Sequence, residues 1–495
     1  MNGAAAARTG RGTLAILLPF SHSRRKTTMT RFYKPVGARL GDTIPFFWDG
    51  VFHVFFLKRF ADDTHDRVET DWCHISTTDF VEFEDHGVAI PRGTASDPDF
   101  SAATGSVVRV GDEFHAYYTG FRKWDGSSDG RHQTVLRARS TDLVSWTKDP
   151  GFALVSDENH FNADEWRDPF VFFDTDAQRY RMLVAGQTLT GPSLRRGASV
   201  LAESETTDNW SIRPEPFWAP GIFSMHECPD LFRMGDWWYL VYSTLTDRTV
   251  TRYRMSRSLE GPWVSPADDE LDGLGLYAAK TISDGDRRYL VGWGTNNIAG
   301  QDGAGWLWGG NLIVHELVQE ADGTLSVRQP EITRAVQESR AESRIPIAAT
   351  QVGSAHEFAT TTLLQMPHAG LVDLTFSAEP ETKAFGIELR ATTERDHGYS
   401  VTFEPELRRV VVDRLDRFGA DRPYDIRPYS GATQVRLNVE FDGELYLIYI
   451  NGEQAITLRG YDRTGTELGV FASEGEIVVS DAELIVTQRD EEVQR

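Results

Sequence analysis

The sequence predicts an all-β protein in which a five-bladed β-propeller is followed by a C-terminal β-sandwich. The main observation is a repeat: a turn followed by alternating aromatic and aliphatic residues occurs five times, starting at Trp48, Val110, Thr175, Met234 and Asp284. The copies are about 50 to 65 residues apart, which is the usual length of a four-stranded blade. Helical periodicity is nearly absent, and glycine, aspartate and asparagine separate short strands throughout the chain.

A second element follows most of these copies. It starts at Ser76, Ser140, Glu203 and Ser256, and it reads as the end of a strand, a polar turn and a strand that begins with aromatic residues. The two elements together make a unit of about four strands, so we expect the propeller over residues 31–335. A pair of β-sandwiches is the alternative, but sandwiches do not repeat internally.

The first 30 residues differ in character from the repeats. An apolar run of about eight residues begins at Leu14, which is at the short limit for a signal peptide. Pro19 and the basic residues from Arg24 to Lys26 follow this run, and no clear cleavage site of small residues is present. We expect residues 1–30 to be a disordered leader or an over-extended start. The predicted location is therefore cytoplasmic, with secretion as the alternative.

The chain changes again after the last repeat. The polar stretch AVQESRAESRIP predicts a linker over residues 336–347. From Ala348 onward strands of alternating polarity return, with strong hairpin signals in the Asp-Gly pair at Asp442 and the Asn-Gly pair at Asn451. These patterns predict a β-sandwich over residues 348–495.

The charge of the chain restricts its partners. Lysine and arginine number 51 against 74 aspartates and glutamates, so the formal charge at pH 7 is −23. Such a charge repels nucleic-acid phosphates and anionic lipid head groups, and we expect neither nucleic acid nor a membrane as a partner. No stretch reaches the length of a membrane span. A neutral small-molecule substrate fits better, and a homodimer stays open.

Neither a metal nor another cofactor is expected. The two cysteines, Cys73 and Cys228, lack the paired spacing of a structural zinc site and imply no disulfide framework. The acidic stretch that begins at Ala61 lacks the ligand spacing of a calcium-binding loop. We interpret that stretch as a solvated loop at the rim of the propeller funnel.

Three acids precede the repeated turns. A propeller concentrates chemistry in its central funnel, which the innermost strand of each blade lines. Asp42, Asp168 and Glu227 each lie a few residues before a repeated turn, so we expect them at equivalent positions in the first, third and fourth blades. Neighbouring carboxylates raise one another's pKa, and one ionised and one protonated carboxyl group are the pair that glycoside cleavage needs.

Each of these residues also has a purely structural explanation. An aspartate at the start of a strand commonly caps a turn, and Glu227 could be a buried acid paired with Arg167. Cys228 could be a small core residue. His74 and His226 are explained most simply by local hydrogen bonds. The shared position of the acids in the repeat favours the functional interpretation.

Six segments, in order along the chain, carry a family resemblance. Two of them are WRDPFVFF at Trp166 and MHECPDLF at Met225. The others are DWCHISTTDFVEFEDHGVAI, ATGSVV, LDGLGLYAAKTISDGDRRYLVGW and FDGELYLIYINGEQAITLRGY. These segments resemble the conserved boxes of glycoside hydrolase family 32, the invertase, levanase and inulinase family, including its Arg-Asp-Pro and Glu-Cys-Pro boxes. The resemblance covers nearly the whole chain after Phe32.

The resemblance implies a retaining mechanism. It assigns Asp42 as the nucleophile, Glu227 as the general acid and base, and Asp168 as the stabiliser of the transition state. The first box departs from the family pattern, because the chain reads ARLGDTIPFFWDG where the family has Trp-Met-Asn-Asp-Pro-Asn-Gly. Asp42 still lies at a similar distance before Gly50. Asp49 is the alternative nucleophile, but it lies in the expected hairpin turn.

The resemblance also suggests residues that contact the substrate. An arginine would hold a carboxylate of the site by a bidentate pair, and tryptophans would form walls on which sugar rings stack. The candidates are Arg167, Trp72, Ser106, Trp48, Cys228 and Trp308, with Trp306 as an alternative to Trp308. Leu57 and Lys58 stand where the family more often has glutamine. This departure affects the identity of the substrate more than the type of reaction.

The predicted function is that of an exo-acting glycoside hydrolase. It would cleave terminal β-D-fructofuranosyl linkages in sucrose, fructo-oligosaccharides or related fructosides through a covalent fructosyl-enzyme. The alternatives are fructosyl transfer at the same site, a five-bladed hydrolase of arabinosides or xylosides, and a noncatalytic sugar-binding propeller. The Glu-Cys-Pro box argues against the arabinoside class, and a lost nucleophile would favour the noncatalytic one.

Overall fold

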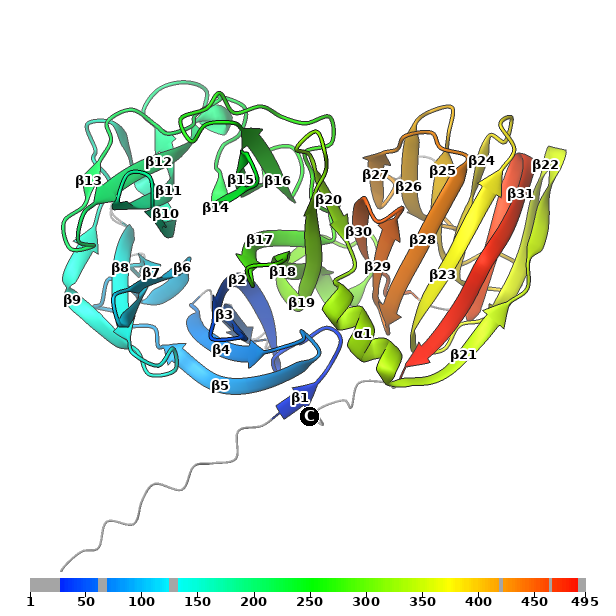
Figure 1. Cartoon of the computed structure of the whole chain (residues 1–495), viewed down its shortest axis with the longest axis horizontal. Helices are drawn as coiled ribbons and strands as arrows, with labels where there is room; N and C mark the ends of the chain where they lie inside the picture. The colour runs from blue at the N-terminus through cyan, green and yellow to red at the C-terminus, as the bar shows by residue number, and fades with distance from the viewer. Residues whose placement is uncertain (1–26, 61–68, 124–131, 418–421, 463–464, 488–495) are drawn as a thin grey trace, which may run out of the picture.

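The computed structural model describes residues 27–60, 69–123, 132–417, 422–462 and 465–487. Almost all of the predicted leader and most of the acidic stretch from Ala61 lie outside the described residues. Figure 1 shows a ring of β-strands beside a layered β-sandwich. The prediction of an all-β fold with a propeller and a C-terminal sandwich is confirmed.

Within the described residues, the ring contains five consecutive sets of antiparallel strands. The first set is β2 (Ala38–Trp48), β3 (Val51–Phe60), β4 (Asp71–Thr77) and β5 (Glu82–Ile90). The second set is β6 (Ser101–Val110), β7 (Glu113–Phe121), β8 (Gln133–Ser140) and β9 (Thr147–Leu154). The third set is β10 (Phe161–Asp174), β11 (Arg179–Thr188), β12 (Gly197–Ser204) and β13 (Ser211–Ile212).

The last two sets complete the ring. The fourth set is β14 (Glu227–Met234), β15 (Trp237–Thr244) and β16 (Val250–Ser256). An isolated bridge between Met255 and Val264 continues this sheet beyond β16. The fifth set is β17 (Leu276–Ser283), β18 (Arg288–Asn297), β19 (Trp306–Gln319) and β20 (Leu325–Arg328).

The first strand of each set lies nearest the centre of the ring (Figure 1). Each of these strands contacts the next one, and β17 contacts β2, so the ring closes. Gly310 of β19 pairs with Leu40 of β2, which joins the first and fifth sets into a nine-stranded sheet that also includes β1 (Thr27–Met29). Because these two sets share one sheet, the blade count of five stays a prediction.

Aromatic residues of the repeat fill the space between neighbouring sets. Phe55 and Trp72 of the first set pack in one buried cluster with Tyr118 of the second set. Tyr117, whose side chain faces the other way, packs with Trp166 of the third set. Full burial of a large apolar side chain contributes about 1.5–3 kcal/mol. Because Tyr117 and Tyr118 point to opposite faces of the second set, one strand packs against both neighbouring sets.

The C-terminal part contains eleven strands among its described residues. They are β21 (Ala341–Ile347), β22 (Thr350–Gln365), β23 (Ala369–Ala378), β24 (Ala384–Ala391), β25 (Tyr399–Glu404), β26 (Arg409–Arg414), β27 (Asp425–Pro428), β28 (Gln434–Asp442), β29 (Leu445–Ile450), β30 (Gln454–Arg459) and β31 (Glu467–Thr487). The first part of β31 pairs with β22 and β24, and its last part pairs with β21 and β23. This long strand therefore connects the two layers of the sandwich.

The two predicted hairpin turns are present in the sandwich. Gly443, between β28 and β29, has φ 58°, and the pair Asn451 and Gly452, between β29 and β30, has φ values of 56° and 69°. Positive φ at both central residues is the requirement of the tight turn that an Asn-Gly pair favours.

The segment predicted as a linker is regular in structure. Helix α1 (Glu331–Ser339) is followed directly by β21, which pairs with the end of β31. Residues 336–347 thus contain the last turn of a helix and a complete strand, and they tie the ring to the sandwich (Figure 1). The domain limits themselves stay a prediction. In the described part of the chain, no helix is long and apolar enough to cross a bilayer.

The propeller and the sandwich share one hydrophobic cluster. It joins Leu276 and Ile313 of the propeller to Leu445, Leu447 and Tyr449 of the sandwich. Because apolar surface from both parts is removed from water at this contact, separating them would expose part of a common core. The sandwich is therefore an integral part of the folded protein.

A buried hydrogen-bond network centred on Asp272 crosses the same interface. Asp272 is 1% exposed, and its carboxylate accepts hydrogen bonds from His315 Nε2 at 2.8 Å, from the Thr457 amide at 2.7 Å and from the Thr457 hydroxyl at 2.6 Å. The second ring nitrogen of His315 lies 3.0 Å from the Tyr449 hydroxyl. Burial acts to raise the pKa of Asp272, but these hydrogen bonds outweigh it and lower the pKa overall.

Candidate active site

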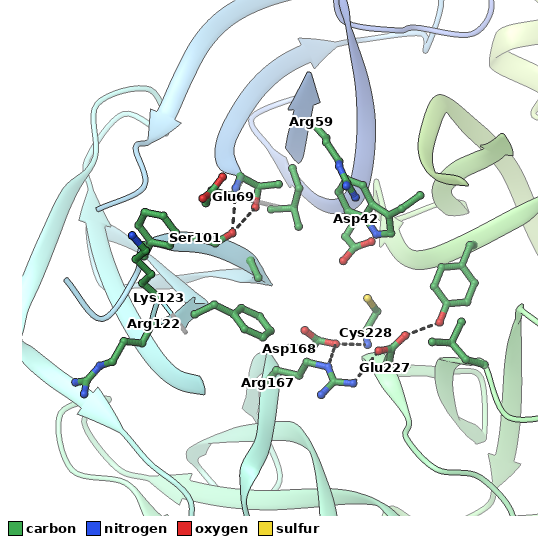
Figure 2. Close-up of a pocket in the computed structure, with 18 of the residues that line it drawn as sticks. Asp42, Arg59, Glu69, Ser101, Arg122, Lys123, Arg167, Asp168, Glu227 and Cys228 are labelled. Carbon is green, nitrogen blue, oxygen red and sulfur yellow. Dashed lines mark hydrogen bonds and ion pairs between the residues drawn. The ribbon is translucent and has the colours of Figure 1, made fainter. Parts of the chain in front are cut away.

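A pocket of about 510 Å³ lies at the centre of the propeller. Asp42, Asp168 and Glu227 all line it, together with the predicted contacts Arg167, Cys228 and Trp308. Figure 2 shows the three carboxyl groups around one central space, with Cys228 between them. Ring closure thus brings together three acids that are spread over 185 positions of the chain, from Asp42 to Glu227.

Bulges in the first strands direct these side chains. In the described part of the chain, the first strand of every set has a register shift, which falls at Leu40/Thr43, Ala103/Gly105, Arg167/Phe170, Glu227/Asp230 and Tyr277/Lys280. A bulge adds one residue to a strand and re-aims the side chains beside it. The five bulges form a ring around the pocket.

Alignment at the bulges corrects the expectation that the three acids occupy equivalent positions. Arg167, Glu227 and Tyr277 are each the last paired residue before the bulge of their strand. Asp168 is equivalent to Cys228, and both have the positive φ of a left-handed residue, 59° and 50°. The repeated turns alone did not reveal this offset, because the two copies begin at different points of the turn: Thr175 follows the last paired residue of β10, whereas Met234 is itself the last paired residue of β14.

Glu227 is held from both sides by its equivalents in the adjacent sets. Arg167 Nη2 donates a hydrogen bond of 2.8 Å to Glu227 Oε1, and the Tyr277 hydroxyl donates to Glu227 Oε2. Arg167 also pairs with Glu165. Burial alone would lower the pKa of Arg167, but the neighbouring carboxylates raise it, so its guanidinium stays charged. The sequence-based expectation that Arg167 holds a site carboxylate is consistent with this geometry.

Asp168 is fixed by backbone hydrogen bonds. Its Oδ2 atom accepts a hydrogen bond of 2.9 Å from the Cys228 amide, and its own amide donates to Thr119 Oγ1 at 2.8 Å. The Asp168 carboxyl is nearly buried, and burial, followed by the charge of Glu227, raises its pKa although Arg167 acts in the opposite direction. The residue has little freedom to turn away from the pocket.

Asp42 lies on the opposite side of the pocket from Asp168 and Glu227 (Figure 2). Its Oδ1 atom accepts a hydrogen bond of 3.1 Å from the indole nitrogen of Trp293. Burial and then the charge of Asp168 raise the pKa of Asp42 to about 7, while the Trp293 hydrogen bond works against this increase. Gly41 is required beside it, because a Cβ at that position would lie 1.9 Å from the Trp308 ring.

Three predicted substrate contacts are not among the residues that line the pocket. Trp72 is fully buried between two sets, and its indole nitrogen donates to the Ala103 carbonyl. Trp48 is at the far end of β2 from Asp42, and the Arg109 guanidinium packs against its ring at 4.3 Å from the ring centroid. The Ser106 hydroxyl accepts a hydrogen bond from the Val171 amide. These three residues stabilise contacts between strands. The family resemblance alone could not distinguish such residues from residues that contact the substrate.

The remaining sequence predictions concern one acid and two histidines. Asp49 is exposed in the turn between β2 and β3, at φ 50°. The ring nitrogens of His74 and His226 lie 3.0 Å from His53 and 3.3 Å from the Ser199 hydroxyl, respectively. These positions agree with the structural explanation given for each.

Sequence reasoning missed Tyr277, Trp293 and Lys280. Tyr277 holds Glu227, and Trp293 holds Asp42. Lys280 is buried and donates to the carbonyl of Gly105 in the second set. All three lie in the segment LDGLGLYAAKTISDGDRRYLVGW, which carries part of the family resemblance, so that segment was the signal that could have found them. In the described residues, no group of three or more metal-ligating side chains is arranged to hold an ion.

The fold and the pocket define a class of protein: a β-propeller joined to a β-sandwich, with three carboxyl groups in the central funnel. The chain matches the N-terminal domain of glycosyl hydrolases family 32 over residues 43–323 and the C-terminal domain of that family over residues 331–486. It belongs to this family. The N-terminal match begins directly after Asp42, where the first box departs from the family pattern.

Curated relatives are similar to part of the chain. A levanbiose-producing levanase of Bacillus subtilis (strain 168) is 27% identical over 322 residues, which cover 58% of this chain and 57% of the relative. The insoluble beta-fructofuranosidase isoenzyme CWINV5 of Arabidopsis thaliana is 25% identical over 297 residues, or 54% of this chain and 50% of the relative. The chain thus spans about half the length of these curated relatives.

A solved structure confirms the architecture over nearly the whole chain. Fructan 1-exohydrolase IIa from Cichorium intybus superposes with a TM-score of 0.74 at 17% identity, covering 94% of this chain and 98% of that one. At this level of identity the likeness concerns the fold alone.

The raised pKa of Asp42 predicts a pH-dependent stability. A charged Asp42 is disfavoured in the fold, so the wild type loses stability as the pH rises from about 4 to about 7. Asparagine carries no charge. We therefore expect Asp42→Asn to unfold at a higher temperature than the wild type at pH 8, by a margin equivalent to about 2–4 kcal/mol, and to differ little at pH 4. Thermal unfolding of both proteins at pH 4 and at pH 8 measures this difference in stability. A difference of equal size at the two pH values would contradict the prediction.

Proposed function

We propose that the protein is a retaining glycoside hydrolase that releases terminal β-D-fructofuranosyl units from sucrose, fructo-oligosaccharides or related fructosides. One observation carries this proposal: three carboxyl groups from separate strand sets line one pocket, and one of them, Glu227, is held between Arg167 and Tyr277. Membership of glycosyl hydrolases family 32 supports the reaction class. The names of the levanase and beta-fructofuranosidase relatives support a fructoside as the substrate.

In the first step, Asp42 would attack the anomeric carbon of the fructosyl unit. The carboxyl of Glu227 would give its proton to the departing glycosidic oxygen as the bond to the anomeric carbon breaks. Attack requires the ionised form of Asp42. Because burial raises the pKa of Asp42 to about 7, only part of the molecules carry this form at neutral pH, and the Trp293 hydrogen bond helps to stabilise it. The hydrogen bonds from Arg167 and Tyr277 would fix the direction from which Glu227 delivers the proton.

In the second step, Glu227 would act as a base. It would take a proton from water, which attacks the anomeric carbon of the covalent intermediate and releases both fructose and Asp42. Asp168 would accept hydrogen bonds from sugar hydroxyls, and these would strengthen as positive charge develops on the ring. The Cys228 amide and Thr119 hold Asp168 ready for that role.

Sugar analysis tests the proposed function. The protein is incubated with sucrose, inulin, levan and an aryl arabinofuranoside, and the released sugars are identified. We expect fructose from one or more of the fructosides, with glucose and fructose in equal amounts from sucrose. An excess of glucose over fructose would instead indicate fructosyl transfer, and no release from any fructoside would contradict the proposal. The cytoplasmic location and the homodimer stay predictions.

A further inference from the structure

The loop between β18 and β19, residues 298–305, leads directly into the pocket wall. It contains the short 3-10 helix η2 (Ile298–Gly300), and its base is closed by a hydrogen bond of 2.8 Å from the Ile298 amide to the Gly305 carbonyl. At the base of the loop, Asn297 of β18 pairs with Trp306 of β19. The position of the loop therefore sets the position of Trp306.

Trp306 forms an exposed aromatic wall beside Glu227. It lines the pocket and is 40% exposed. Its ring centroid lies 5.9 Å from that of Tyr277, whose hydroxyl donates to Glu227, and 5.5 Å from that of Trp293. Leu245, which is 51% exposed, also lines the pocket. Large apolar side chains that are exposed in a pocket are candidates for ligand contact.

The sandwich holds the loop at two points. Asp302 at the tip accepts hydrogen bonds from the Tyr399 hydroxyl and, at 3.0 Å, from the Tyr461 amide. The Tyr461 hydroxyl accepts a hydrogen bond of 2.7 Å from the Asn297 amide at the base. Gly300 faces the Tyr461 ring, where a Cβ would lie 3.5 Å from the ring. We call Asp302 and its two tyrosine partners the loop latch.

We propose that the sandwich controls which leaving groups the pocket accepts, because the loop latch holds Trp306 as the wall against which a sugar leaving group packs. This inference rests on the proposed function. The group that Glu227 protonates must depart on the side of Glu227, and Trp306 packs beside Tyr277, whose hydroxyl holds Glu227. A leaving group with a sugar ring offers a broad face of C–H bonds to Trp306, whereas a methanol leaving group offers only one methyl group.

Two fructosides separate this role from general damage to the enzyme. Sucrose has a glucose leaving group, and methyl β-D-fructofuranoside has methanol. The ratio of kcat/KM for sucrose to kcat/KM for the methyl fructoside does not depend on how much of the protein is folded. We expect Trp306→Ala to lower this ratio about three- to tenfold, which is the usual size of one aromatic contact. Trp306→Phe should restore part of it.

The latch is tested by removing a single hydroxyl group. Tyr399→Phe deletes the hydrogen bond to Asp302 and keeps the ring, and we expect it to lower the same ratio about two- to threefold. Tyr289→Phe is the matched control. Tyr289 also donates to an aspartate, Asp284, but it lies near the opposite end of β18 from the loop. The control should leave the ratio unchanged.

Each outcome decides one part of the inference. An unchanged ratio in Trp306→Ala would overturn the role of Trp306. A lowered ratio in Trp306→Ala with an unchanged ratio in Tyr399→Phe would overturn control by the sandwich. A fall in Tyr289→Phe equal to that in Tyr399→Phe would overturn it as well. A wild type that cleaves no fructoside would instead contradict the proposed function, and the inference would fall with it.

Discussion

Asp42→Asn is expected to lower kcat for sucrose hydrolysis by about 10⁴- to 10⁶-fold. The amide oxygen can still accept the hydrogen bond from Trp293, so the shape of the site should be kept. It cannot form the covalent fructosyl intermediate, because an amide is a poor nucleophile. Binding of sucrose should change little. Initial rates of glucose release and calorimetric titration with sucrose measure the two effects.

Asp49→Asn provides the matched control for this variant. Asp49 is an aspartate of the same segment, but it is exposed in the turn between β2 and β3. Its replacement should leave kcat within about twofold of the wild type, as expected for a surface substitution away from the site. Near-normal turnover by Asp42→Asn, or a large loss in Asp49→Asn, would remove Asp42 from the role of nucleophile.

Asp272→Ala is expected to lower the free energy of unfolding by about 3–5 kcal/mol. The substitution removes the acceptor for His315 and for both Thr457 donors at the buried interface. Since the fold lowers the pKa of Asp272, its contribution is present at neutral pH and is lost as the pH falls below the ordinary value for an aspartate. Chemical unfolding at pH 7, followed by tryptophan fluorescence, measures the change.

Asp322→Ala is the control for the interface variant. Asp322 also accepts hydrogen bonds from the amide and the hydroxyl of one threonine, Thr324, but it lies in an exposed turn after β19. Its replacement should leave the free energy of unfolding nearly unchanged. Similar losses of unfolding free energy in the two variants would contradict a stabilising role for the interface network. A separate unfolding step for the sandwich would contradict a core shared with the propeller.

The architecture could be predicted from local patterns. The repeated turn with alternating aromatic residues, such as that from Trp237 in β15, fixes where strands begin and how they follow one another. The Asn-Gly pair at Asn451 likewise predicted a hairpin that is present. The linker was harder to predict, because β21 is a strand only through its pairing with β31, more than 130 positions away.

Within the site, the sequence located the acids better than their surroundings. Asp42, Asp168 and Glu227 were found from their places before repeated turns, and all three line the pocket. Trp72 was misplaced, because its burial depends on packing against another set. Tyr277 was missed, because its role depends on a hydrogen bond to Glu227 across 50 positions of the chain.

The sequence by itself determined the order of strands, the strands that carry the three acids and the family to which the chain belongs. These are properties of short segments, in which the alternation of side chains is set by the backbone. Only the tertiary structure decided which residues flank each acid, which tryptophans face the pocket and how the sandwich supports its wall. Those features depend on bulges and ring closure, which bring together residues that no local pattern connects.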